Sequence, residues 1–320
     1  MRVTWLLGDR EGPPATWPPL LMLLGGATAT LLAETLFAGG LAWELMTRRQ
    51  VIGTLLMFIT LPPYLVAMAG VVHRRAQAAV DALAPLSSAD AAAEVREALT
   101  RLSHGALAML LFGALFGLWQ NRAFLQRILD GAAAMPIDAV FITGNAIVWA
   151  AVGLLLAIGV RTCRALSRFG GSLRLDLYDL AVLRPLARVS TGYVLLVAGA
   201  MVFMPLQSLD AQLRLQNYDV GIVVSVLAGS ALFVLPLLGA RARVAQLKAL
   251  RLADLRGRLE ATARTDVQDM ELISAHMDRV RQIHAWPIDV QLVTRVFAYV
   301  IIPPLAWVAA AVVEGWVEAL

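Results

Sequence analysis

The sequence contains few of the residues from which catalytic and metal sites are usually built. Cys163 is the only cysteine in 320 residues, which excludes a disulfide framework and a thiolate metal cluster. The four histidines do not follow a metal-binding spacing, and no nucleophile elbow, phosphate-binding loop or dinucleotide fingerprint is present. We therefore expect the protein not to be an enzyme and to bind no metal or cofactor.

Charged residues are also scarce. They make up 16% of the chain, whereas 59% is hydrophobic and the mean hydropathy is +0.70. A soluble domain usually carries about 25% charged residues. The uncharged residues gather in long runs, which are typical of transmembrane helices. The sequence therefore predicts an all-α polytopic membrane protein, with one integral membrane domain over residues 1–320.

Lysine is almost absent, because the 27 basic residues comprise 26 arginines and Lys248 alone. This bias, together with abundant alanine and leucine, is typical of GC-rich bacterial coding, and it favours a bacterial inner membrane. The basic residues adjoin the apolar runs, where they orient a membrane protein. We expect their partners to be anionic lipid headgroups, not nucleic acid.

Seven apolar stretches are long enough, or nearly so, to cross a bilayer, since about 20 helical residues span about 30 Å of hydrocarbon. They lie at 18–43, 51–72, 105–122, 137–160, 189–208, 219–240 and 288–313. Asp9, Glu11 and two proline pairs precede the first stretch, so we expect an uncleaved helix instead of a signal peptide. If that stretch were re-entrant or interfacial, the chain would cross six times.

The basic residues of the connecting segments predict the orientation. The lysines and arginines of these segments are divided unevenly. There are 21 in segments 1–17, 73–104, 161–188 and 241–287, and 5 in the remaining connecting segments. Because cytoplasmic loops carry the excess of basic residues, we expect a cytoplasmic N-terminus and an outside C-terminus.

Segment 241–287 is the longest stretch between predicted spans. Its apolar residues recur every three or four positions, as on one face of a helix, and approach a coiled-coil repeat from residue 252 onward. We predict a long amphipathic cytoplasmic helix there, either lying on the membrane or joining copies in a homo-oligomer. Its association face would comprise Leu252, Leu255, Leu259, Met270 and Met277.

We single out three polar or ionisable residues inside predicted spans. Glu34 is near the middle of the first span, Asn145 lies in the fourth and Arg295 in the last. An ionisable group at membrane depth costs about 2.5–3.5 kcal/mol and often marks an ion or solute path. The structural alternatives are a protonated Glu34 with a hydrogen bond, an Arg295 that reaches the interface, and an Asn145 that joins two helices.

Proline and glycine pairs add two further hypotheses. Pro62–Pro63 and Pro303–Pro304 interrupt the second and last spans, and paired broken helices are typical of transporter binding sites. Independent kinks absorbed by packing are the alternative. Gly113 and Gly117 form a GxxxG pattern that favours close helix packing.

These features favour a channel or secondary transporter, with Glu34 and the proline pairs lining the path. The alternative is a membrane-embedded scaffold or sensor that acts through the helix at 241–287. The first hypothesis expects a polar cavity beside Glu34, and the second expects a tightly packed bundle with an exposed apolar seam.

Overall fold

The computed structural model describes residues 7, 17–36, 49–130, 136–203, 219–261, 267–284, 286, 294 and 298. Within these residues there is no β-strand, which confirms the predicted all-α class. The elements in chain order are α2 (Trp17–Leu36), α4 (Arg49–Leu83), the 3₁₀ turn η1 (Ala84–Leu86), α5 (Ala89–Thr100), α6 (His104–Gln120), α7 (Arg122–Leu129), α8 (Pro136–Ser172), the 3₁₀ turn η2 (Leu180–Leu183), α9 (Arg184–Met201), α10 (Asp219–Ala261) and α11 (Val267–Gln282).

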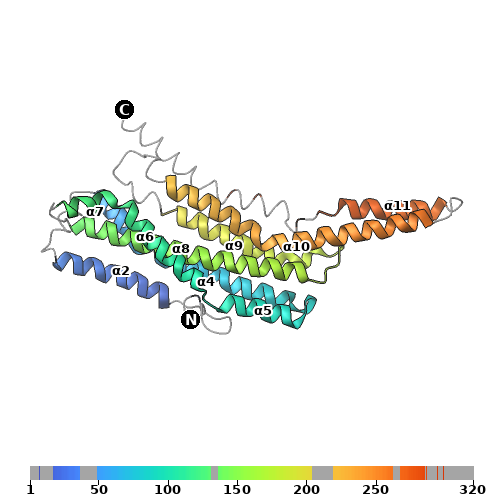
Figure 1. The fold of residues 1–320 in the computed structure, drawn as a ribbon, viewed down its shortest axis with the longest axis horizontal. Coiled ribbons are helices and arrows are strands. Elements are labelled where there is room, and N and C mark those ends of the chain that lie inside the picture. Colours follow the sequence, from blue (N-terminus) through green and yellow to red (C-terminus); the bar gives the residue numbers. More distant parts are fainter. Residues whose placement is uncertain are drawn as a thin grey trace, which may run out of the picture.

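The helices form an elongated bundle in which α8 is central (Figure 1). α8 contacts α4, α6 and α10, while α9 packs against both α4 and α10. α2 lies beside α4 and makes fewer contacts with α8. The buried core is made largely of aliphatic side chains from these helices.

Four stretches of the described chain are helical, long and apolar enough to cross a membrane: Leu55–Leu86, Phe141–Ser172, Leu180–Met201 and Val220–Ala261. α6 is apolar as well but has only 17 residues. The coarse prediction of a helical protein with several membrane-crossing helices is thus supported. The seventh predicted span lies outside the described residues, apart from positions 294 and 298, so the count of seven and the orientation stay predictions.

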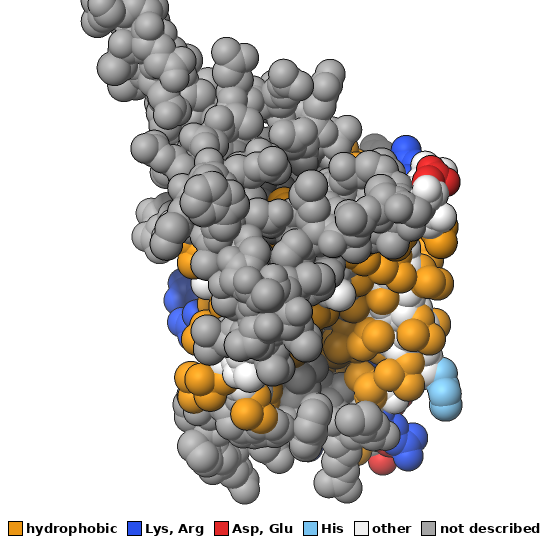
Figure 2. All heavy atoms as spheres, turned by 90° about the vertical axis from the view of Figure 1, so that its left-hand side faces the viewer, with side chains coloured by type: hydrophobic (Ala, Val, Ile, Leu, Met, Phe, Trp, Pro, Cys, Tyr) orange, Lys and Arg blue, Asp and Glu red, His pale blue; other side chains and the backbone are white. Residues whose placement is uncertain are grey.

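Large apolar side chains are exposed on the outside of the bundle. On α6, Leu111, Phe112 and Leu115 expose 61%, 61% and 64% of their surface. Figure 2 shows such hydrophobic side chains gathered along one side of the bundle, with charged residues at the edges of the apolar area. A monomeric soluble protein rarely exposes a large contiguous apolar patch, whereas a lipid-facing helix does.

α4 continues as a helix through Pro62 and Pro63, which are both buried. Each proline removes a helical N–H donor, and neighbouring helices make such losses tolerable in transmembrane segments. The next residue, Tyr64, donates from its hydroxyl towards the Leu195 and Leu196 carbonyls of α9 at 3.1 and 3.3 Å. The proline pair therefore sits in a packed contact between α4 and α9.

Small residues bring α6 and α8 into close contact. A Cβ atom on Gly117 would lie 2.7 Å from the Asn145 carbonyl oxygen and 2.8 Å from the Cα of Ala146. Polar side chains join the same helices, since Gln120 Oε1 accepts hydrogen bonds from Asn145 Nδ2 at 3.1 Å and Trp149 Nε1 at 2.8 Å. Asn145 and the Gly113–Gly117 pair thus lie together in this helix interface.

The predicted cytoplasmic helix is two helices. α10 has 43 residues and is about 65 Å long at 1.5 Å per residue, so its second half extends beyond the bundle, and α11 folds back along it (Figure 1). The apolar seam closes inside this hairpin, because Leu255, Met277 and Val280 are buried there. Leu252 and Leu259 pack against them, while Met270 is half-buried. Much of the predicted association face therefore contacts the other arm of the same hairpin.

Candidate functional site

Three cavities follow one another at the level where α4, α5, α8 and α9 meet. The first, here called the arginine cleft, has a volume of about 740 Å³ and opens between α5, the start of α6 and α8. The second, the chamber, has about 10 Å³ and lies behind Arg161 and Ser103. The third, the inner cavity, has about 90 Å³ between α4, α8, α9 and α10. Arg161 lines both the cleft and the chamber, and Thr162 lines both the chamber and the inner cavity.

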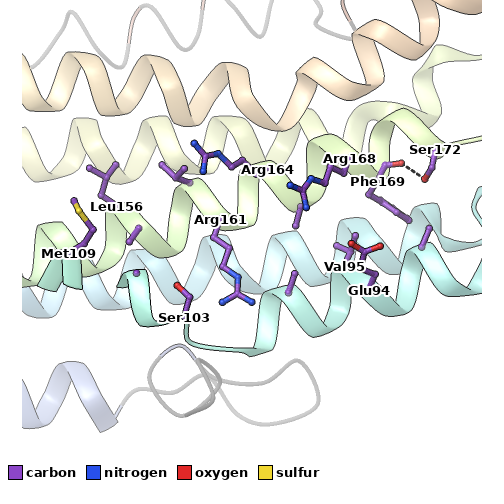
Figure 3. Close-up of a pocket in the computed structure, with 16 residues that line it drawn as sticks. Glu94, Val95, Ser103, Met109, Leu156, Arg161, Arg164, Arg168, Phe169 and Ser172 are labelled. Atoms are coloured by element: carbon purple, nitrogen blue, oxygen red, sulfur yellow. Dashed lines mark hydrogen bonds between the residues drawn. The ribbon is translucent and has the colours of Figure 1, made fainter. Parts of the chain in front are cut away.

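The arginine cleft takes its charge from α8. Arg161, Arg164 and Arg168 recur at intervals of three and four residues, which places them on one face of the helix. Figure 3 shows Arg161 pointing towards Ser103 at the start of α6, with Glu94 of α5 across the cleft from the other two arginines. Arg164 and Arg168 are exposed, and neither forms an ion pair with a carboxylate of the described residues.

Arg161 forms the wall between the cleft and the chamber. Its Nη1 donates a hydrogen bond of 2.9 Å to the carbonyl oxygen of Arg101, which caps the C-terminus of α5. Ser103 stands beside it, and its hydroxyl oxygen accepts from the Ala106 N–H at the start of α6. The two contacts hold this wall where α5, α6 and α8 meet.

The inner cavity has an apolar lining with several polar side chains. His73 of α4 is 3% exposed, Thr162 of α8 is 3% exposed, and Tyr193 of α9 is 6% exposed. Tyr193 also interacts with Thr162 and Cys163. Ser225 of α10 lines the cavity as well. Four helices therefore bring polar groups to one enclosed space, an arrangement typical of ligand sites and proton paths in membrane proteins.

The volumes limit what each cavity can hold. A water molecule needs about 10–15 Å³ of such space, so the chamber admits about one water and the inner cavity several. The cleft falls within the range of about 300–1,000 Å³ that is usual for small-molecule sites. A molecule larger than water therefore fits the cleft but not the chamber behind Arg161.

Three of the predicted path residues are described with their side chains, and none of these three lines the cavities. Asn145 lies in the α6–α8 interface, and Pro62 and Pro63 lie in α4 where it packs against α9. Glu34 belongs to α2, and its side chain lies outside the described residues. Arg295, Pro303 and Pro304 also lie outside them. A path shared by these seven residues therefore stays a prediction.

The sequence holds a weak signal for the cavity residues that were not predicted. His73, Thr162 and Tyr193 each lie within a few residues of the cytoplasmic end of a predicted span, so they share one level of the membrane. Their level follows from hydropathy, but the adjacency of their helices does not. Among the described residues, no three histidine, cysteine, aspartate or glutamate side chains are grouped to hold a metal ion.

The fold and site thus define a helical protein with several helices of membrane-crossing length and, between them, a mainly apolar cavity that several polar side chains line. Comparison with protein-family models, curated proteins and solved structures finds no match to this chain. The function must therefore be argued from the cavities and their side chains.

Proposed function

We propose that the protein is a channel or secondary transporter that moves an ion or small solute across a bacterial inner membrane. The observation that carries this proposal is the row of three cavities that share lining residues, from the arginine cleft through the chamber to the inner cavity. Buried polar side chains are costly at membrane depth, and a position beside a cavity is typical of a transport path.

The cleft serves as the cytoplasmic entrance in this proposal. Segment 161–188 is one of the basic segments that predict the cytoplasmic side, and the cleft arginines belong to it. Their positive charge attracts anions and repels cations, since opposed charges in a cleft raise the local concentration of one sign. We therefore expect anions, rather than cations, to use this entrance.

Arg161 and Thr162 divide the path into its three parts. Movement of the Arg161 side chain away from the Arg101 carbonyl would join the chamber to the cleft. Thr162 and Tyr193 then supply hydroxyl groups that exchange hydrogen bonds with a passing solute or water. Leu7, which is buried and lines the inner cavity beside Gly70 of α4, contributes to its apolar wall.

Flux through purified protein in liposomes tests the proposal with a matched pair of variants. Thr162→Val keeps the side-chain shape and removes a hydroxyl from the path. Thr191→Val makes the same change at a half-buried position whose hydroxyl donates to the Ala187 carbonyl within α9. We expect wild-type flux of chloride or phosphate, about tenfold lower in Thr162→Val and unchanged in Thr191→Val. If Thr162→Val and Thr191→Val gave equal flux, the proposed transport path past Thr162 would be contradicted.

A second candidate function is a scaffold or sensor that acts through the α10–α11 hairpin. The observation in its favour is that the hairpin projects from the bundle and exposes Leu250 and Leu272. If these leucines formed a docking face between copies of the chain, replacing both by serine would abolish the assembly of those copies. Unchanged size in analytical ultracentrifugation, with transport retained, would leave the transport proposal as the better account.

A further inference from the structure

We infer that the arginine cleft binds the phosphate group of an anionic phospholipid, with the acyl chains lying along the neighbouring apolar surface. This inference is independent of transport, because a bound lipid can stabilise or regulate the bundle whether or not a solute crosses it. It rests on the charge of the cleft, its level in the membrane, and its division into a basic and an apolar part.

The cleft has an excess of positive charge. Its lining includes Arg161, Arg164 and Arg168 but only one acid, Glu94, so three positive charges face one negative charge. Arg164 and Arg168 have no ion-pair partner among the described carboxylates. Arginine recognises phosphate through its planar fork of N–H donors, which bind two oxygens at once. A phosphate group would therefore supply the negative charge that no carboxylate of the described residues brings to Arg164 and Arg168.

The start of α6 strengthens the preference for an anion. Gly105 in its first turn lines the cleft, and no acidic residue occupies that turn. The exposed N–H groups at a helix N-terminus carry partial positive charge. They add to the field of the arginines and point to the same sign of ligand.

The cleft lies at the level expected for lipid headgroups. α8 has 37 residues and is about 55 Å long, whereas the hydrocarbon core is about 30 Å thick. About 20 residues counted from Pro136 cross that core, so the arginines follow just beyond it. Helical side chains lean towards the helix N-terminus, which here is the membrane side. Figure 3 shows the guanidinium groups of Arg164 and Arg168 turned back along α8 towards Leu156.

The membrane end of the cleft is apolar. The cleft is lined there by Met109, Leu156, Ala157 and Val160, and Phe112, three residues after Met109 on α6, is exposed beside it. Free inorganic phosphate has no group that would contact this part. A phospholipid has both a phosphate for the arginines and acyl chains for the apolar side chains, so it matches the whole cleft.

Binding of defined lipids to the full chain tests the inference. The protein in maltoside micelles is titrated with phosphatidylglycerol or phosphatidylcholine, and native mass spectrometry measures the bound lipid. The variant R164Q/R168Q removes two charges from the cleft. The matched control R184Q/R188Q removes two charges from exposed arginines of α9, near the start of a predicted span and outside the cleft. A competition arm adds inorganic phosphate at the same concentration as the lipid.

We expect phosphatidylglycerol to bind at least about tenfold more tightly than phosphatidylcholine, and R164Q/R168Q to lose that preference. R184Q/R188Q should keep it. An equal loss in both double variants would overturn the site in favour of general surface charge, and unchanged binding in R164Q/R168Q would overturn it outright. Displacement of the lipid by inorganic phosphate would refute the lipid assignment, because it would show that the acyl chains contribute nothing. Unfolding midpoints of all variants should match that of the wild type.

Discussion

Substitution of Gly117 by alanine should destabilise the protein, whereas the same substitution at Gly257 should not. Alanine favours a helix over glycine by about 1 kcal/mol, and both positions lie inside helices. A methyl group at Gly117 would meet three backbone atoms of α8 at 2.7–2.9 Å, and backbone atoms cannot rotate away. At Gly257 nothing lies within 4 Å. Overpacking costs about 1–3 kcal/mol, so after the gain in helix propensity we expect a net loss of up to about 2 kcal/mol for Gly117→Ala.

The only cysteine provides the assay. Cys163 is 0% exposed in the core, so a thiol-reactive fluorophore reports unfolding as temperature rises. A loss of 1 kcal/mol lowers the midpoint by about 2–4 °C in a protein of this size class. Gly257→Ala should leave the midpoint unchanged or raise it. If Gly117→Ala were as stable as Gly257→Ala, the close approach of α6 to α8 would be refuted.

Three further substitutions test other contacts. Tyr64→Phe removes the hydroxyl that bonds two carbonyls of α9, and it should lower stability by about 1 kcal/mol in the thiol assay; an unchanged midpoint would argue against the α4–α9 contact. Gln120→Leu leaves two donors of α8 without their acceptor and should cost about 1–3 kcal/mol in the same assay, whereas a neutral effect would show that the bonds are not formed. Lys248→Met removes the ammonium group that binds two carbonyl groups at the end of α11; amide hydrogen exchange should quicken in the hairpin and stay the same in the bundle, and equal exchange in both proteins would contradict the cap.

Hydropathy and helical periodicity predict most of the described helices. A long apolar run predicts a membrane-crossing helix because backbone N–H and C=O groups without hydrogen bonds are too costly in lipid. The runs predicted at 51–72, 137–160, 189–208 and 219–240 correspond to α4, α8, α9 and α10. The helix ends are predicted less well, because charged residues continue a helix beyond the membrane. α8 extends to Ser172 and α10 to Ala261, each well past the end of its predicted span.

The candidate site could not be predicted in the same way. Glu34 and the proline pairs stand out in the sequence because each is unusual for its own span. The cavities arise where four helices meet, and which helices are neighbours depends on packing between residues far apart in the chain. His73 and Tyr193 are 120 positions apart and come to line one cavity because α4 packs against α9. The hairpin was missed for a related reason, since a continuous apolar repeat does not reveal that its two halves pack on each other.

A chemical block placed in the path tests the transport proposal most directly. In a Cys163→Ala background, Thr162→Cys puts a single thiol between the chamber and the inner cavity. Proteoliposome flux is measured before and after treatment with a small charged methanethiosulfonate reagent, with mass spectrometry reporting the modified fraction. We expect the thiol to react and flux to fall in proportion to its modification. Full modification with unchanged flux, or a thiol that never reacts while flux proceeds, would contradict transport through these cavities.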